Sequence, residues 1–164
     1  MTDFKKVSDD LSIAGQISSE ELKQLAIGGF KSVLNLRSSD ENGFFHDEKQ
    51  EAQIVGLEYT NIPLNSQAPN QELTAEAILE IDHLPKPILI HCAGGARAGG
   101  IALIAEAIQA GLTYEQIAQK ANELSINLEQ PHLKQFLLEK FAARQIYIFC
   151  DYSVCKFIMG YNFS

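Results

Sequence analysis

The pattern of apolar and polar positions predicts short strands that alternate with helices. Apolar runs that end at glycine, proline or polar turns indicate strands, whereas longer segments with apolar residues at helical spacing indicate helices. The runs that predict strands are 11–14, 31–36, 57–62 and 88–92, and the segments that predict helices are 20–27, 46–55, 72–83, 98–109, 113–124 and 131–144. Strands alternating with helices, followed by helices alone, predict an α/β domain with a mostly parallel central sheet flanked by helices.

The last part of the chain differs from the rest in composition. Residues 145–164 are rich in tyrosine and phenylalanine, interrupted by Asp151 and Lys156. They predict either a late strand and helix that cover the same core or a surface that binds a partner. We favour packing, because large exposed aromatic patches are uncommon on monomers. The sequence therefore divides into one domain over 1–144 and an extension over 145–164 packed on that domain.

Composition and charge narrow the class of protein. The chain has 164 residues, 46% of them hydrophobic, and a formal net charge of −8, which argues against a nucleic-acid partner. Its three cysteines, Cys92, Cys150 and Cys155, have neither disulfide-framework nor zinc-site spacing and favour a reducing compartment. The first ten residues are polar and no apolar run is long enough to span a membrane. We therefore expect a soluble cytoplasmic protein without a metal or another cofactor.

Candidate chemistry concentrates where the run 88–92 passes into a glycine-rich turn and then a helix. Ligands of parallel α/β sheets bind beyond the carboxyl ends of the strands, where Cys92 lies. Backbone N–H groups of a tight loop and a helix N-terminus bind anions and favour a nucleophilic thiolate. Arg97 adds a planar fork of donors for a tetrahedral oxyanion. The residues predicted to bind that oxyanion are Ala93, Gly94, Gly95, Ala96 and Arg97. The alternative is an ordinary buried cysteine, which the combined pattern disfavours.

Several motifs in order resemble one known family. The chain from Phe4 to about Arg144 is similar to the phosphatase-like domain of the beta-lactamase hydrolase-like family, a bacterial branch near the dual-specificity tyrosine phosphatases. The segments that carry the resemblance are Ala14-Gly15-Gln16, Val33-Leu34-Asn35-Leu36-Arg37, Ile62-Pro63-Leu64 and the loop from His91 to Arg97. The resemblance implies a dual-specificity phosphatase-like fold with the nucleophile loop between a strand and a helix.

The resemblance also implies roles for the loop residues. Cys92 would attack phosphorus to give a phosphocysteine, and Arg97 with the loop amides would bind the phosphate oxygens. His91 would influence the thiolate without contacting the phosphate. The alternative is a strand-end histidine whose ring only forms hydrogen bonds with the backbone. The implied activity is a cysteine-dependent phosphatase acting on a phosphorylated protein or a small phosphate ester. Phosphate or sulfate should bind in the loop, and we expect neither nucleic acid nor membrane as a partner. The sequence leaves the oligomeric state open.

Three departures from the family pattern keep other functions open. Four residues separate Cys92 from Arg97 where the usual tyrosine-phosphatase loop has five, a spacing that also resembles the rhodanese-like sulfurtransferases. Ala98 follows the arginine, where phosphatases usually have a serine or threonine that helps the thiolate leave. Asn65 stands where the family's general-acid aspartate is expected, and asparagine cannot donate a proton in that way. A slow phosphatase and a catalytically weak oxyanion-binding module therefore both remain possible.

The polar loop after the second predicted strand contains candidates for a replacement acid, and these are Asp40, Glu41, His46 and Asp47. Most surface charges are solvated, so we expect these residues to form an ordinary acidic loop. Arg37, at the end of the same strand, is either a second phosphate ligand or a surface arginine.

Overall fold

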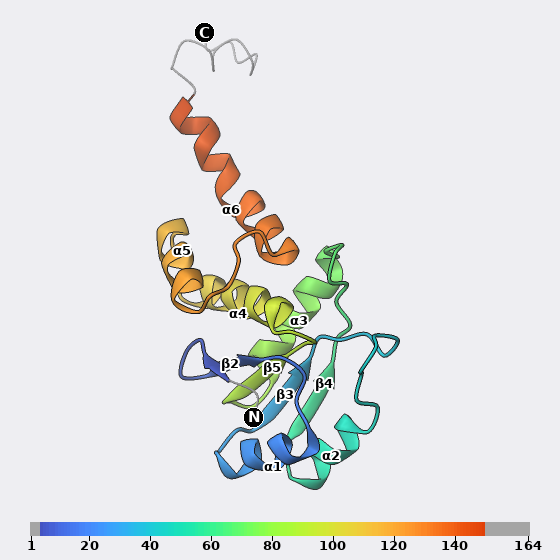
Figure 1. Ribbon diagram of the computed structural model, residues 1–164. Helices are drawn as coiled ribbons and strands as arrows, with labels where there is room; N and C mark the ends of the chain where they lie inside the picture. The colour runs from blue at the N-terminus through green and yellow to red at the C-terminus, as the bar shows by residue number, and fades with distance from the viewer. Residues whose placement is uncertain (1–3, 150–164) are drawn as a thin grey trace.

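A five-stranded sheet lies at the centre of the protein (Figure 1). The computed structural model describes residues 4–149. The strands are β1 (Lys5–Lys6), β2 (Leu11–Ala14), β3 (Ser32–Asn35), β4 (Glu58–Asn61) and β5 (Ile88–His91), and their order across the sheet is β1-β2-β5-β3-β4. All neighbours pair in parallel except β1 with β2. The predicted α/β class with a mostly parallel sheet is confirmed. The short edge strand β1 was not predicted, because two exposed lysines carry no strand pattern.

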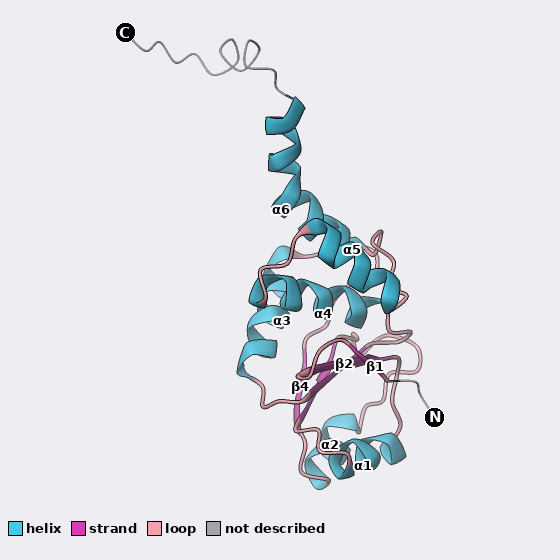
Figure 2. Cartoon of the chain, turned by 90° about the vertical axis from the view of Figure 1, so that its left-hand side faces the viewer, coloured by secondary structure: helices cyan, strands magenta, loops and turns pink. Residues whose placement is uncertain are grey.

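Helices cover both faces of the sheet. Helices α1 (Ser19–Ile27) and α2 (Glu48–Ile54) lie on one face, and α3 (Gln71–His83) and α4 (Ala96–Gln109) lie on the other (Figures 1 and 2). Helices α5 (Tyr114–Glu123) and α6 (Pro131–Phe149) pack on α4 as an additional layer. Ser18 and Thr113 cap the N-termini of α1 and α5, and each forms a capping box with the third helical residue.

Side chains alternate between two hydrophobic clusters, one on each face of the sheet. On β5, Ile88 and Ile90 join the cluster under α3 and α4, whereas Leu89 joins the cluster over α1 and α2. All three side chains are completely buried. Burial of each such side chain contributes about 1.5–3 kcal/mol relative to exposure. The strand that carries the nucleophile loop is therefore fixed by apolar contacts on both sides.

The strand register brings four loops to one edge of the sheet. Ala14, Asn35, Asn61 and His91 form a single row across four parallel strands. The segments that follow these residues all leave the sheet at its carboxyl edge. The Asn61 side chain donates hydrogen bonds to the backbone carbonyls of Asn35 and Arg37, both at 2.9 Å, which fixes the start of the loop after β3. This edge is where ligands of parallel sheets bind.

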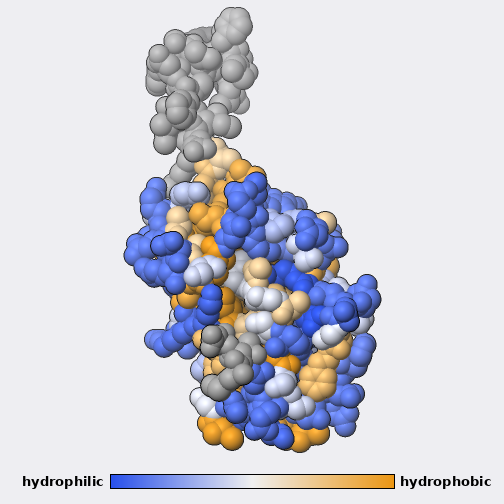
Figure 3. Space-filling model, viewed as in Figure 1, coloured by the Kyte–Doolittle hydropathy of each residue, from blue (hydrophilic) through white to orange (hydrophobic). Residues whose placement is uncertain are grey.

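Helix α6 continues beyond the end predicted at residue 144 and reaches Phe149. It leaves the layered body at one end of the molecule (Figure 1), and apolar surface gathers where it leaves that body in the face shown in Figure 3. Residues 150–164 lie outside the described part of the chain, so the prediction that the aromatic extension packs on the domain stays a prediction. No helix within residues 4–149 combines the length and apolar character that crossing a bilayer requires.

Candidate active site

The loop after β5 forms a cup whose floor is buried and whose rim is exposed. Helix α4 begins at Ala96, two residues before the predicted start, so Arg97 lies in its first turn. Cys92 is 1% exposed and Arg97 5% exposed, whereas Ala93, Gly94 and Ala96 are exposed. The Gly95 N–H donates to Cys92 Sγ at 3.1 Å. Gly95 has φ +89°, a conformation that favours glycine, and this turn aims its N–H at the sulfur.

The turn after β2 supports the loop from behind. The Cys92 N–H donates to the Ala14 carbonyl at 3.3 Å, and the Gln16 N–H donates to the Ala93 carbonyl at 3.0 Å. A Cβ atom on Gly15 would lie 3.0 Å from the Ala93 carbonyl oxygen, so only glycine fits without a shift. The Ala14-Gly15-Gln16 motif therefore holds the backbone of the nucleophile loop in place.

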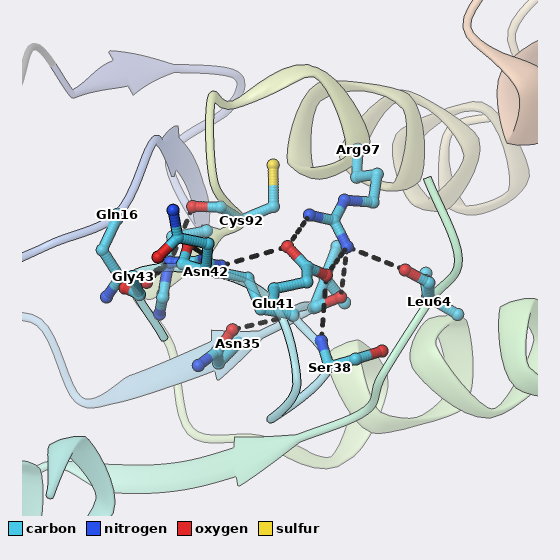
Figure 4. Close-up of polar contacts among 12 residues, drawn as sticks. Gln16, Asn35, Ser38, Glu41, Asn42, Gly43, Leu64, Cys92 and Arg97 are labelled. Carbon is cyan, nitrogen blue, oxygen red and sulfur yellow. Dashed lines mark hydrogen bonds and ion pairs between the residues drawn. The ribbon is translucent and has the colours of Figure 1, made fainter. Parts of the chain in front are cut away.

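Arg97 is held by four hydrogen bonds along one edge of its guanidinium (Figure 4). Nη1 donates to the carbonyls of Leu36 and Leu64, at 3.2 and 2.8 Å. Both terminal nitrogens donate to the Glu41 carboxylate, at 2.6 and 2.7 Å. Bidentate arginine–carboxylate pairs are short and geometrically specific. Arg97 is therefore fixed in one orientation before any ligand binds.

The same contacts leave two guanidinium donors for an oxyanion. Arginine has five N–H donors, and the contacts above use both on Nη1 and one on Nη2. The Nε donor and the second Nη2 donor remain, and together they form the side-on pair that binds two oxygens of a tetrahedral anion. The hydrogen bonds with Glu41 raise the pKa of Arg97, and the charge interaction and hydrogen bond with Cys92 raise it further. Cys92 is thus close enough to Arg97 for one anion to contact both.

Arg37 is buried and holds the loop that follows β3. Its side chain is 3% exposed. It donates to Gln16 Oε1 at 2.5 Å, to the carbonyls of Asn42 and Gly43 at 2.6 and 2.8 Å, and to Glu41 at 3.2 Å. The interpretation of Arg37 as a surface arginine is wrong, because its guanidinium is enclosed by the loop that follows it. These hydrogen bonds hold the loop over the edge of the sheet, and this position of the loop places Glu41 beside Arg97.

The expectation of an ordinary acidic loop is wrong for Glu41. Its side chain is 27% exposed and pairs with two arginines. The hydrogen bonds from Arg97, more than any other contact, lower its pKa from 4.5 to about 2. Glu41 is therefore ionised at neutral pH and cannot serve as the missing general acid. Asp40, His46 and Asp47 are exposed, as a solvated loop requires.

A buried carboxylate supports His91, the residue before the nucleophile. His91 Nε2 donates to Glu48 Oε1 at 2.5 Å, and both side chains are completely buried. Gln16 Nε2 donates to the other Glu48 oxygen at 2.7 Å. His91 Nδ1 lies 3.5 Å from the Cys92 carbonyl oxygen. The main partner of His91 is therefore a carboxylate, in contrast to the backbone-satisfied histidine of one interpretation.

A series of polar contacts in the interior connects His91, which precedes Cys92, to Arg97, which lies after it. From His91 the contacts pass through Glu48 to Gln16, and Arg37 donates to the Gln16 amide oxygen. Arg37 also contacts Glu41, which pairs with Arg97. A buried carboxylate or guanidinium requires such compensation, because an unpaired charge in the interior is costly. The network fixes the residues before and after the nucleophile relative to each other.

Two positions lack the groups that the family pattern leads one to expect. Asn65 is exposed, and its Oδ1 accepts hydrogen bonds from the N–H groups of Gln67 and Ala68, at 2.8 and 2.9 Å. This side chain shapes a turn and offers no acidic proton. Ala98 is completely buried in the first turn of α4 and has no hydroxyl.

Sequence reasoning missed Glu48 and the pairing of Glu41 with Arg97. A signal for Glu48 was present, because it lies four residues before Ala52 and such residues share one face of a helix. Ala52 is completely buried, so Glu48 also faces the interior. Glu41 carried no comparable signal, since its contact depends on how the loop after β3 folds back. No cluster of three or more potential metal ligands occurs among residues 4–149.

The depressed pKa of Glu41 predicts an acid-dependent loss of stability. Its ion pairs contribute stability that is complete above pH 4.5 and is lost as the pH falls toward about 2. Glu41→Gln should therefore lower the free energy of unfolding at neutral pH, and the difference from the unmodified protein should shrink across that range. Urea unfolding at stepwise pH measures this difference, with Asp40→Asn as an exposed matched control. A difference that stays constant from pH 6 to pH 2 would contradict the assigned pairs.

Comparison with known proteins places this chain in a described family. The family model for the phosphatase-like domain of beta-lactamase hydrolase-like proteins matches residues 3–109. The beta-lactamase hydrolase-like protein of Agrobacterium fabrum is 26% identical over 115 residues, which cover 68% of this chain and 27% of that protein. The chain therefore spans about a quarter of this curated relative.

Solved structures share the fold at low sequence identity. A DUF442 protein from Shewanella putrefaciens CN-32 has a TM-score of 0.72 and 23% identity, over 85% of this chain and 91% of that one. The core catalytic domain of the S. cerevisiae phosphatase SIW14 has a TM-score of 0.67 and 18% identity, over 88% of this chain and 91% of that one. These neighbours show the fold, and the family match identifies a phosphatase-like domain. The chain belongs to the phosphatase-like domain family of the beta-lactamase hydrolase-like proteins.

Proposed function

We propose that this domain is a cysteine-dependent phosphatase that hydrolyses phosphate monoesters through a phosphocysteine. The observation that carries the proposal is the placement of Cys92 beside the edge of the Arg97 guanidinium that the contacts with Glu41, Leu36 and Leu64 leave open. The exposed loop from Ala93 to Ala96 gives a substrate access to the buried sulfur. Family membership agrees with this activity.

In the first step, Cys92 Sγ attacks phosphorus as a thiolate. The new S–P bond forms while the bond from phosphorus to the ester oxygen breaks, and the leaving oxygen takes a proton from solvent. Arg97 binds two phosphate oxygens, and the loop N–H groups with the N-terminus of α4 stabilise the remaining charge. This local positive potential admits an anion to a protein whose net charge is −8.

In the second step, water attacks the phosphocysteine and the S–P bond breaks. Inorganic phosphate leaves, the thiolate is restored and one proton passes to solvent. Ala98 supplies no hydroxyl to assist the departing thiolate, and Asn65 supplies no proton for the leaving oxygen in the first step. General acid catalysis is typically worth 10²–10⁴-fold in rate. We therefore propose a slow enzyme whose rate depends strongly on the leaving group.

The shared fold leaves several phosphate esters open as substrates. One neighbour was solved with phosphotyrosine, another with PI(5)P, and SIW14 is a PP-IP phosphatase. We propose a phosphotyrosine-like or small phosphate-ester substrate, since the exposed rim admits a single phosphate group on a protein or a small molecule. A catalytically weak oxyanion-binding module is the second candidate, and Asn65 and Ala98 are the residues that favour it.

Hydrolysis of an aryl phosphate, measured beside sulfur transfer from thiosulfate to cyanide, tests the proposal on one preparation. We expect release of inorganic phosphate and no thiocyanate above background. Cys92→Ser should abolish phosphate release, because serine is not ionised at neutral pH, while tungstate still binds in the loop. Thiocyanate without phosphate would favour the sulfurtransferase. Tungstate binding without hydrolysis of any ester would leave the binding module.

The absence of a proton donor at position 65 predicts a steep dependence on the leaving group. An aryl phosphate whose phenol is strongly acidic should be cleaved at least about 10²-fold faster than phosphotyrosine, because its leaving oxygen needs no proton in the transition state. Steady-state kinetics on a series of substituted phenyl phosphates measures this slope. Equal rates across the series would show that another residue acts as the general acid.

A further inference from the structure

A groove between α3, α4 and α6 contains two buried polar atoms without partners. Thr74 Oγ1 and His132 Nε2 make no hydrogen bond within the described part of the chain. Both residues line the same groove, whose volume is about 570 Å³. A buried polar atom without a partner costs about 1–3 kcal/mol. Because both atoms line the same groove, a single ligand could satisfy both of them.

The unpartnered nitrogen of His132 is a hydrogen-bond donor. Gln130 Oε1 accepts the Leu133 N–H at 3.0 Å, which orients the amide so that Gln130 Nε2 donates to His132 Nδ1 at 2.9 Å. Nδ1 is therefore an acceptor, and the ring proton lies on Nε2. Burial, and after it the charge of Arg97, lowers the pKa of His132, so the ring is neutral at pH 7. The missing partner is an acceptor.

Close packing holds this donor in place. His132 is 1% exposed and lies in the first turn of α6, next to Gln130. A Cβ atom on Gly100 would lie 2.2 Å from Gln130 Oε1, so Gln130 fits tightly against α4. His132 therefore cannot readily turn Nε2 toward another acceptor. Thr74, in the first turns of α3, adds a hydroxyl that can donate to the same ligand.

The remainder of the groove is mostly apolar and opens to solvent. Ile78, Ile104 and Phe136 line it, and Leu79 and Ile108, 58% and 52% exposed, mark its open side. Glu139, also in the lining, already accepts hydrogen bonds from Gln71 and Gln135 at 2.6 and 2.9 Å. The groove thus combines a buried pair of donors with an apolar channel. Its volume is within the range of small-molecule sites.

We propose that this groove binds a medium-chain aliphatic carboxylate. One carboxylate oxygen accepts from His132 Nε2 and the other from the Thr74 hydroxyl, while the chain lies against Ile78, Ile104 and Ile108. The N-terminal turns of α3 and α6 and the charge of Arg97 supply positive potential at the carboxylate. None of the residues that line the groove belongs to the loop from Cys92 to Arg97, so the proposal does not rest on the phosphatase chemistry.

Titration of the full chain with decanoate, below its aggregation concentration, tests the proposal. With histidine labelled by ¹⁵N, decanoate should shift the Nε2–H resonance of His132 in a saturable way. We expect 1-decanol to bind at least about tenfold more weakly, because it has one oxygen and no charge. Thr74→Val, which keeps the side-chain shape, should weaken decanoate about tenfold by removing one charge-assisted hydrogen bond.

A pair of exposed leucines provides the matched control. Leu79→Ala should weaken decanoate binding, whereas Leu138→Ala, equally exposed but outside this groove, should not change it. Failure of decanoate to shift His132, equal binding of decanol, or a silent Thr74→Val would overturn the proposal. Contacts between the aromatic rings of 150–164 and the groove methyls in ligand-free protein would overturn it as well, since the chain itself would then fill the groove.

Discussion

The bidentate pair between Glu41 and Arg97 is the interaction on which the rest of the site depends. Arginine has a flexible side chain whose ordering costs up to about 2 kcal/mol of rotamer entropy. Glu41 and the carbonyls of Leu36 and Leu64 meet that cost before a ligand arrives. They occupy one edge of the guanidinium and leave the side-on edge for an anion. The negative charge of Glu41 is itself balanced by Arg37, so the loop and the nucleophile site form one electrostatic unit.

The sheet explains how segments distant in sequence assemble this unit. Gln16, Arg37, Glu41 and Cys92 all follow strands whose last residues share one row. Apolar residues on both faces of β5 hold this row, and a shift of one residue in register would move every loop. Glu48 enters the same unit from α2 and joins His91 to Gln16. The core packing that fixes the strands therefore also fixes the geometry of the site.

The sequence predicted each described helix, each described strand except β1, and the position of the nucleophile loop, because these depend on local periodicity and turn chemistry. The paired acids depend on tertiary contacts, which explains why they were not predicted. Nothing local distinguishes Glu41 from the exposed Asp40, and their difference arises when Arg37 folds the loop back. Likewise, Asn65 could be recognised as a non-acid, but its turn of hydrogen bonds required the structure. The second groove followed only from unpartnered atoms, which no sequence pattern reveals.

The most direct test asks whether Glu41 positions Arg97 for a ligand or blocks it. Glu41→Asp keeps the charge but shortens the reach, so it changes geometry without changing net charge. If Glu41 positions the guanidinium, calorimetry should show tungstate binding about tenfold more weakly to this variant. Asp40→Glu, a charge-conserving change at the exposed neighbour, should leave the affinity unchanged. Equal or tighter binding to Glu41→Asp would contradict the account, because it would mean that the carboxylate competes with the oxyanion.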